Sequence, residues 1–243
     1  MALSSRFWVV IPAAGTARRM QSSVPKQYLV LRGRSVIEWS VAPFLARSDC
    51  AGVVVVLAAD DRRWSALALS NDLRVNTALG GAERSVSVRQ GLASLRGRAE
   101  PDDWILVHDA ARPCLSHSDL DRLIDTVRGH AVGGLLAAPV IDTLKKSGSD
   151  GCVESTVDRA ELWRALTPQM FRCELLEKAL AHASNQSTMI TDESQAVELL
   201  GLRPLLVAGS ADNLKITVPE DLRRAEHILA LAVGNDVRRT EGS

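Results

Sequence analysis

The sequence predicts an α/β protein with a Rossmann-like, mainly parallel sheet covered by helices on both faces. Continuous apolar runs recur over residues 9–11, 53–58, 104–107, 135–138 and 205–208. Such runs are typical of strands that are buried on both faces. Stretches with helical periodicity separate most of them, and this alternation is typical of parallel sheets. The 243 residues, 46% of them hydrophobic, can also bury a substantial core.

Helix signals follow in chain order. Ser35 and Glu38 have the spacing of a capping box. It opens a helix that carries Ile37, Val41, Phe44 and Leu45, although Pro43 should end or kink this helix early. Residues 85–95 and 120–127 look like further amphipathic helices. The last helix carries Pro219 in its first turn, a position that suits proline.

Residues 140–158 break this pattern. They are short, partly alternating and interrupted by the turn sequence SGSDG at 147–151, which predicts an antiparallel hairpin. A protruding hairpin exposes apolar edges, so we interpret 139–163 as a dimerisation arm. A flexible surface hairpin is the alternative. The arm would be an insertion in a single domain over 1–233, followed by a disordered tail over 234–243.

Charge and cysteine content exclude several classes of function. Lys and Arg number 29 and Asp and Glu number 29, so no overall charge favours nucleic acid or an anionic membrane. The four cysteines form no C-x-x-C pair, which indicates neither a zinc site nor a disulfide framework. No apolar run approaches the ~20 residues of a membrane span, and few residues precede the first strand. We therefore expect a cytoplasmic protein.

The segment VVIPAAGTARRM at 9–20, followed by PKQ at 25–27, joins a predicted buried strand to a basic loop of small residues. Small residues let backbone N–H groups approach an anion, and Arg19 and Lys26 supply positive charge. This suits phosphate binding. The alternative is an ordinary turn with two solvated cations, because the loop has neither P-loop nor dinucleotide-fold spacing.

A second glycine-rich segment, GGAERSVS at 80–87, combines a glycine pair with a predicted helix start. Its free N–H groups and the hydroxyls of Ser85 and Ser87 could meet a base, a ribose or a phosphate. A plain glycine turn in which Ser85 caps the helix is the alternative.

The segment VHDAARP at 107–113 places Asp109 at the carboxyl end of a predicted strand, where open α/β sheets bind ligands. A single aspartate there can hold Mg²⁺, which takes its remaining ligands from water and phosphate oxygens. An Asp109–Arg112 ion pair is the alternative. His108 is interpreted as a packing or hydrogen-bonding residue, because one histidine does not make a metal cluster.

Together with six further segments, these motifs resemble the 2-C-methyl-D-erythritol 4-phosphate cytidylyltransferase family, from Phe7 to about Leu231. The further segments occur in the expected order: PKQY at 25–28, AAPVIDT at 137–143, TVDR at 156–159, LTPQ at 166–169, ITDE at 190–193 and ADNLKI at 211–216. The resemblance implies the nucleotidyltransferase form of the predicted fold. It also implies that the phosphate of methylerythritol phosphate attacks the α-phosphorus of CTP and releases pyrophosphate, with Mg²⁺ as cofactor.

By resemblance, the site residues fall into groups. Arg19 and Lys26 would be catalytic, and Asp109 would bind the metal. The nucleotide would be bound by Pro12, Ala13, Ala14, Gly15, Gly81, Ser87, Ala110 and Lys215. The polyol phosphate would be bound by Asp109, Arg112, Thr143, Arg159, Thr167, Thr191 and Lys215. From the residues alone, Arg159 and Lys215 would be solvated charges and Thr191 a helix N-cap.

The resemblance further implies a homodimer in which Thr143 and Arg159 on one arm reach the neighbour's site. One departure from the family pattern is Ala17, where relatives commonly have a second glycine. Alanine there would cost about 1 kcal/mol if the loop needs a positive φ. Rival functions are a ribitol 5-phosphate cytidylyltransferase, more distantly a sugar-1-phosphate nucleotidylyltransferase, and a CTP-binding module without catalysis.

Overall fold

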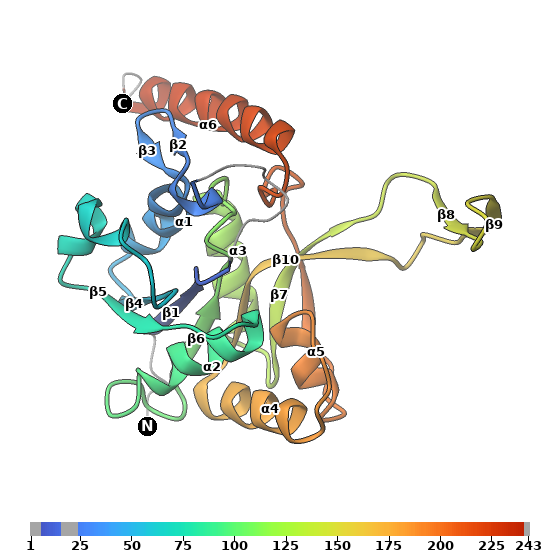
Figure 1. The fold of residues 1–243 in the computed structure, drawn as a ribbon, viewed down its shortest axis with the longest axis horizontal. Helices are drawn as coiled ribbons and strands as arrows, with labels where there is room; N and C mark the ends of the chain where they lie inside the picture. The colour runs from blue at the N-terminus through green and yellow to red at the C-terminus, as the bar shows by residue number, and fades with distance from the viewer. Residues whose placement is uncertain (1–5, 16–23, 241–243) are drawn as a thin grey trace.

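The computed structural model of the chain describes residues 6–15 and 24–240, and its centre is a seven-stranded sheet (Figure 1). In this sheet, β10 runs antiparallel to its neighbours β6 and β7, and the other pairings are parallel. The predicted mainly parallel α/β fold is confirmed. The strand order is β11 (Leu205–Ala208), β7 (Gly133–Pro139), β10 (Trp163–Arg172), β6 (Trp104–Val107), β1 (Phe7–Pro12), β4 (Cys50–Leu57) and β5 (Val75–Leu79).

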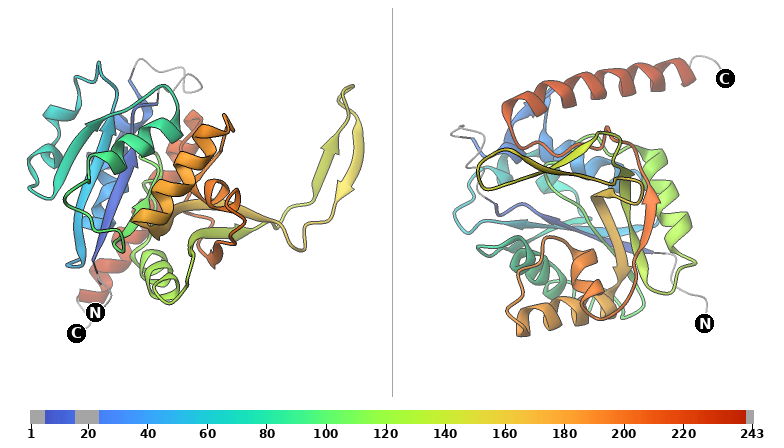
Figure 2. Two further views of the ribbon diagram at one scale, coloured as in Figure 1. Left: turned by 90° about the horizontal axis from the view of Figure 1, so that it is seen from below. Right: turned by 90° about the vertical axis from the view of Figure 1, so that its right-hand side faces the viewer.

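Helices cover both faces of the sheet (Figures 1 and 2). On one face α1 (Val36–Leu45) and α3 (His117–Val127) pack against strand residues such as Val9. On the other face α2 (Arg84–Ala93), α4 (Cys173–Asn185) and α5 (Glu193–Glu198) pack with strand residues such as Val10. Both Val9 and Val10 are fully buried, as expected for strands that are covered on both sides.

The last helix, α6 (Pro219–Thr240), packs near the small hairpin of β2 (Val30–Leu31) and β3 (Arg34–Ser35). A third apolar cluster, which includes Leu31, Ile216 and Ala225, fills the space between them. The backbone of 234–240 is helical where the sequence analysis predicts a disordered tail, and residues 241–243 lie outside the described part of the chain.

The predicted hairpin is present between the ends of β7 and β10. It consists of β8 (Leu144–Ser147) paired antiparallel with β9 (Val153–Val157), and it extends away from the body of the protein (Figures 1 and 2). Apolar side chains along this segment are exposed, among them Ile141, Val153 and Trp163. The hairpin therefore has the exposed apolar surface that the prediction of an arm requires.

The strands β10 and β5 of the central sheet, the short strands β2 and β3, and the helix α4 were not predicted. The sequence of β10 contains Pro168, which argues against a strand that is paired on both sides. The ladder between β10 and β7 is irregular between Ala165 and Gln169, so the proline occupies this irregular part. β5 is a short, half-buried strand, and its sequence VNTAL contains no continuous apolar run that would predict it. The helix α4 was also missed. No helix in the described part of the chain is long and apolar enough to cross a membrane.

Candidate active site

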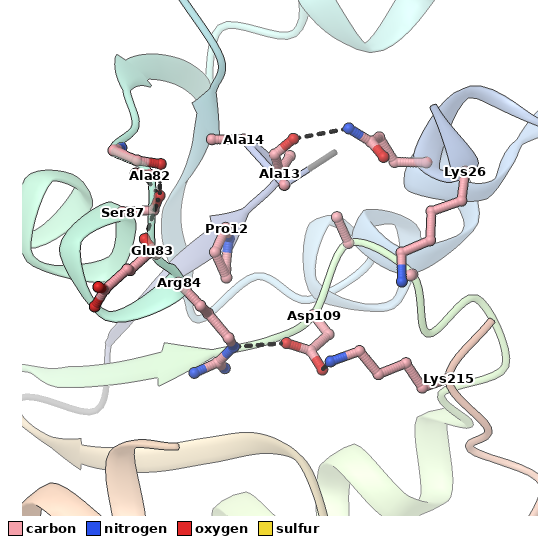
Figure 3. Close-up of a pocket in the computed structure, with 15 residues that line it drawn as sticks. Pro12, Ala13, Ala14, Lys26, Ala82, Glu83, Arg84, Ser87, Asp109 and Lys215 are labelled. Atoms are coloured by element: carbon pink, nitrogen blue, oxygen red, sulfur yellow. Dashed lines mark hydrogen bonds and ion pairs between the residues drawn. The ribbon is translucent and has the colours of Figure 1, made fainter. Parts of the chain in front are cut away.

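A cavity opens at the carboxyl ends of β1 and β6, beside the N-terminus of α2 (Figure 3). This is the edge at which open parallel sheets bind ligands. The cavity brings together ten of the predicted site residues from five separate segments of the chain. These lining residues are Pro12, Ala13, Ala14, Gly15, Lys26, Gly81, Ser87, Asp109, Ala110 and Lys215.

Small residues after β1 form one wall. The N–H of Ala13 donates to the carbonyl of Val56 at 2.8 Å, so the strand geometry continues into the loop. The side-chain amide of Gln27, which is buried, donates to the carbonyl of Ala13 at 2.7 Å. The first loop is therefore fixed at its beginning by the segment that follows it, and this same segment supplies Lys26.

Lys26 reaches into the cavity from the short helical turn Lys26–Tyr28, and its Nζ donates to the carbonyl of Ile216 at 2.9 Å. Ile216 follows Lys215, another lining residue. This hydrogen bond joins segments 190 residues apart in the sequence. Two lysines from distant parts of the chain are thus placed around one cavity, as the resemblance implies.

The opposite wall consists of the glycine pair and the start of α2. The N–H of Gly81 donates to the hydroxyl of Ser87 at 3.2 Å, and this hydroxyl donates to the carbonyl of Glu83 at 3.1 Å. Ser87 is buried, so its visible role is to shape the glycine turn. Ser85 does not cap the helix, because the N-cap residue is Glu83.

Asp109 is surrounded by three cations, of which Figure 3 shows Arg84 and Lys215. Its Oδ1 accepts from Arg84 Nε at 3.0 Å, and its Oδ2 lies 2.8 Å from Lys215 Nζ and 3.6 Å from Arg112 Nε. Burial alone would raise the pKa of Asp109, but Arg84 and Lys215 outweigh burial and lower that pKa well below its usual range. Asp109 is therefore ionised at neutral pH. The Asp109–Arg112 pair exists, but it is the longest of the three.

Thr167 and His108 lie behind Asp109 in the interior. The hydroxyl of Thr167 accepts from the Asp109 N–H at 3.1 Å and lies 3.0 Å from His108 Nδ1. His108 Nε2 lies 3.1 Å from the carbonyl of Arg112, and all of these contacts are satisfied if His108 is neutral with its proton on Nε2. Burial lowers the pKa of His108 to about 4, in agreement with the predicted packing role.

Arg112 is also behind the cavity wall. It is 9% exposed, and its Nη1 donates to the carbonyl of Asn213 at 2.6 Å. Asn213 in turn donates to the carbonyl of Thr167 at 2.7 Å. Arg112 and Thr167 therefore contact Asp109 and its supports, and neither lines the cavity.

The remaining predicted residues lie elsewhere. Thr143 and Arg159 are exposed on the arm, where Arg159 donates to the carbonyl of Ile141. Thr191 is exposed just before α5, and its N–H and hydroxyl donate to Gln195 Oε1 at 2.7 and 3.1 Å. The N-cap of α5 is Asp192, so the interpretation of Thr191 as the cap is wrong by one residue. Arg19 and Ala17 lie outside the described residues.

Sequence reasoning gave no role to two charged residues beside the cavity. Arg84 forms a bidentate ion pair with Glu193, in which Nη1 lies 2.6 Å from Oε1 and Nη2 lies 3.0 Å from Oε2. Glu193 is fully buried. In the sequence, a glutamate in the first turn of a helix reads as an ordinary favourable charge, so it gave no signal of a buried pair.

The sheet is mainly parallel, and the cavity at its strand ends is lined by small residues, two lysines and one ionised aspartate. This arrangement is typical of nucleotide-binding α/β proteins and agrees with the nucleotidyltransferase class. The family model for 2-C-methyl-D-erythritol 4-phosphate cytidylyltransferase matches residues 7–231. The chain belongs to this family.

Curated relatives and solved structures with the same name are similar along nearly the whole chain. The Pseudomonas aeruginosa PAO1 protein is 52% identical over 221 residues, which cover 90% of this chain and 94% of that protein. The Xanthomonas campestris protein (strain 8004) is 47% identical over 228 residues, covering 94% and 86%. The Francisella tularensis crystal structure has a TM-score of 0.79 at 31% identity, covering 92% of this chain and 99% of that one.

Proposed function

We propose that this protein joins CTP and 2-C-methyl-D-erythritol 4-phosphate, giving 4-diphosphocytidyl-2-C-methyl-D-erythritol and pyrophosphate in isoprenoid precursor synthesis. Family membership over residues 7–231 supports the reaction. The structural observation that carries it is the convergence of Lys26, Lys215 and Asp109 on one cavity with small-residue walls.

The cavity suits a reaction between two anions. A phosphate oxygen of the polyol attacks the α-phosphorus, a new P–O bond forms, and pyrophosphate leaves with the electrons of the broken P–O bond. Catalysis of such transfers depends mainly on positioning and on neutralising charge. Lys26 and Lys215 provide positive charge at the cavity, and Arg19 is predicted to add more from the first loop.

The nucleotide is assigned to the space between the two small-residue walls. Ala13, Ala14 and Gly15 on one side and Gly81 on the other have no long side chains, so backbone groups can approach the base and phosphates closely. The second phosphate is assigned to the side of Asp109 and Lys215. Arg112 and Thr167 support that side through Asp109, and their direct contact with the polyol phosphate stays a prediction.

The residues around Asp109 fit Mg²⁺ if the phosphates of the nucleotide supply further ligands to the ion. Among the described residues there is no group of three or more His, Cys, Asp or Glu side chains suited to a metal. Mg²⁺ is commonly held by one or two carboxylates together with substrate phosphates, and a carboxylate has about four lone-pair sites. Asp109 would hold the ion, which would supply further neutralisation of the phosphate oxygens.

The arm is assigned to a second copy of the chain. Thr143 and Arg159 lie on a segment that extends away from the body, and neither lines the cavity of its own chain. The exposed apolar residues of the arm favour contact with another protein surface. A homodimer in which each arm completes the neighbour's site accounts for both features, and the cytoplasm stays the expected location.

A substrate panel tests the reaction. Purified protein with CTP and Mg²⁺ should release pyrophosphate with methylerythritol phosphate and far less with ribitol 5-phosphate, and UTP or GTP should replace CTP poorly. Preference for ribitol 5-phosphate would overturn the assigned substrate. CTP binding by calorimetry with no product from any polyol phosphate would indicate a binding module instead.

A further inference from the structure

Arg84 connects two carboxylates that belong to different parts of the site. It is the first residue of α2 and lines the cavity. Its Nε donates to Asp109 at 3.0 Å, and its two terminal nitrogens donate to Glu193 at 2.6 and 3.0 Å. One guanidinium therefore joins the end of β6 to the start of α5, which lie 25 and 109 residues further along the chain than Arg84.

Glu193 depends on this contact. It is fully buried, and burial raises its pKa while Arg84 opposes the rise. A buried carboxylate that loses its partner is strongly destabilising. The buried Glu193 carboxylate thus fixes the position of the Arg84 guanidinium. The guanidinium Nε, which donates to Asp109, is held in place as a result.

Glu193 also belongs to the segment that carries Thr191, which is predicted to bind the second substrate. This segment is held to β10 by Gln169, whose amide donates to Asp192 at 3.0 Å and accepts from the Ser194 N–H at 2.7 Å. Arg84 adds the connection from this segment to the cavity. The side of the site assigned to the polyol phosphate therefore consists of pieces that meet at Arg84.

We propose that Arg84 is a positioning residue that, with Glu193 as its anchor, orients Asp109 and the Thr191 segment for the second substrate. This rests on the proposed function, because that function places a second phosphate beside Asp109 and Lys215. Arg84 acts here through its neighbours. The competing role, direct binding of a nucleotide phosphate, is opposed by the engagement of Nε, Nη1 and Nη2 with the two carboxylates.

The test compares Arg84→Lys, Glu193→Gln and the double variant. Lysine keeps the positive charge but cannot form the planar fork. In Arg84→Lys, kcat/KM for methylerythritol phosphate should fall by about tenfold or more, while the calorimetric Kd for CTP stays within about twofold. Glu193→Gln should act in the same direction by at least about threefold, and the double variant should be no worse than Arg84→Lys because both changes break one connection.

Arg47→Lys is the matched control. Arg47 forms a similar two-pronged pair with Asp49, 2.9 Å at each contact, at the end of the sheet away from the cavity. The Arg47→Lys variant should have a lower melting temperature, but its KM values for CTP and for methylerythritol phosphate should not change. If Arg84→Lys does not fold, Glu193→Gln decides the matter alone.

Unchanged kcat and KM in folded Arg84→Lys or Glu193→Gln would overturn the proposal and indicate a purely structural pair. A weakened Kd for CTP equal to the loss in kcat/KM would assign Arg84 to the nucleotide instead. Failure of the proposed function is distinguishable, because then the unaltered protein itself would not turn over methylerythritol phosphate.

Discussion

At the scale of single residues, the site depends on a few charges whose positions are set by hydrogen bonds to the backbone. Lys26 is held toward the cavity by the carbonyl of Ile216, and the backbone N–H of Asp109 donates a hydrogen bond to the hydroxyl of Thr167. These contacts orient the charges before any substrate arrives. Pre-orientation of this kind lowers the cost of arranging charge during the reaction.

Lys26→Ala removes one of these charges. A charge-assisted contact is worth about 1.5–3 kcal/mol, so turnover should fall by at least about tenfold while the melting temperature changes little. Steady-state kinetics and thermal unfolding measure the two effects. Lys178→Ala, at an exposed position on α4, is the control, and turnover of Lys26→Ala equal to that of this control would contradict the role.

His108 predicts a dependence of stability on pH. Its pKa is about 4 in the folded protein against an ordinary 6.5, so between these values the unfolded chain binds more protons. The free energy of unfolding should therefore fall as pH falls from about 6.5 to 4, with His108 contributing up to about 1.4 kcal/mol per pH unit.

Urea unfolding at pH 7 and pH 5 measures this dependence. His108→Gln cannot titrate in this range, so its loss of stability between the two pH values should be smaller than that of the unaltered protein. Equal losses in both proteins would show that other groups cause the dependence.

At the scale of elements, the junction between β5 and α2 lies directly against Ala14, at the start of the first loop. A Cβ added at Gly80 would lie 2.4 Å from Ala14 Cβ and 2.9 Å from Ser87 Oγ. These distances are too short for real contacts, so one wall of the cavity must shift. The absence of a side chain at Gly80 therefore lets the two small-residue walls of the cavity approach each other.

Gly80→Ala should weaken CTP binding by about tenfold, an effect of about 1.4 kcal/mol, which is in the range that overpacking costs. Calorimetry with CTP measures it. Gly129→Ala is the control, because an added Cβ there meets nothing within 4 Å. Unaltered CTP affinity in Gly80→Ala would show that the loop after β1 adapts freely.

Element prediction from sequence succeeded where the local pattern is strong. The buried strands β1, β4 and β6 appear as predicted, because a short, continuous apolar run between turn signals is typical of a strand that is buried on both faces. It failed for β10, because a proline within a strand is tolerated only where the ladder is irregular, and pairing partners decide where that is. The α1 helix carries Phe44 and Leu45 as predicted, and Pro43 does not end it early.

At the scale of the whole molecule, the arm separates part of the predicted site from the cavity of its own chain. Arg159 is exposed on the arm, whereas Lys26 lines the cavity. If the site is shared between two subunits, these two residues act in different chains. Mixed dimers can distinguish a shared site from one that is complete in each chain.

Mixing Arg159→Ala with Lys26→Ala should restore activity that neither variant has alone. In a random mixture half of the dimers are mixed, and each has one intact site, so recovery should reach about a quarter of the unaltered activity. Mixing Lys215→Ala with Lys26→Ala is the control. Both residues line the cavity of their own chain, so each chain of a mixed dimer has a damaged cavity and no intact site forms. Recovery no greater than in this control would contradict the shared site.

The sequence by itself determined the fold class and the order of the motifs, because strand burial and glycine-rich turns leave local patterns. The roles predicted for Lys26, Asp109 and Lys215 rest on the resemblance of these motifs to the family, since the residues alone leave each of them an alternative. Only the tertiary structure decided that Arg84 binds both Asp109 and Glu193, and that Arg112 and Thr167 lie behind the cavity wall. The physical reason is distance along the chain. Contacts across 25 to 109 residues depend on which strand ends and helix starts become neighbours, and no local pattern carries that information.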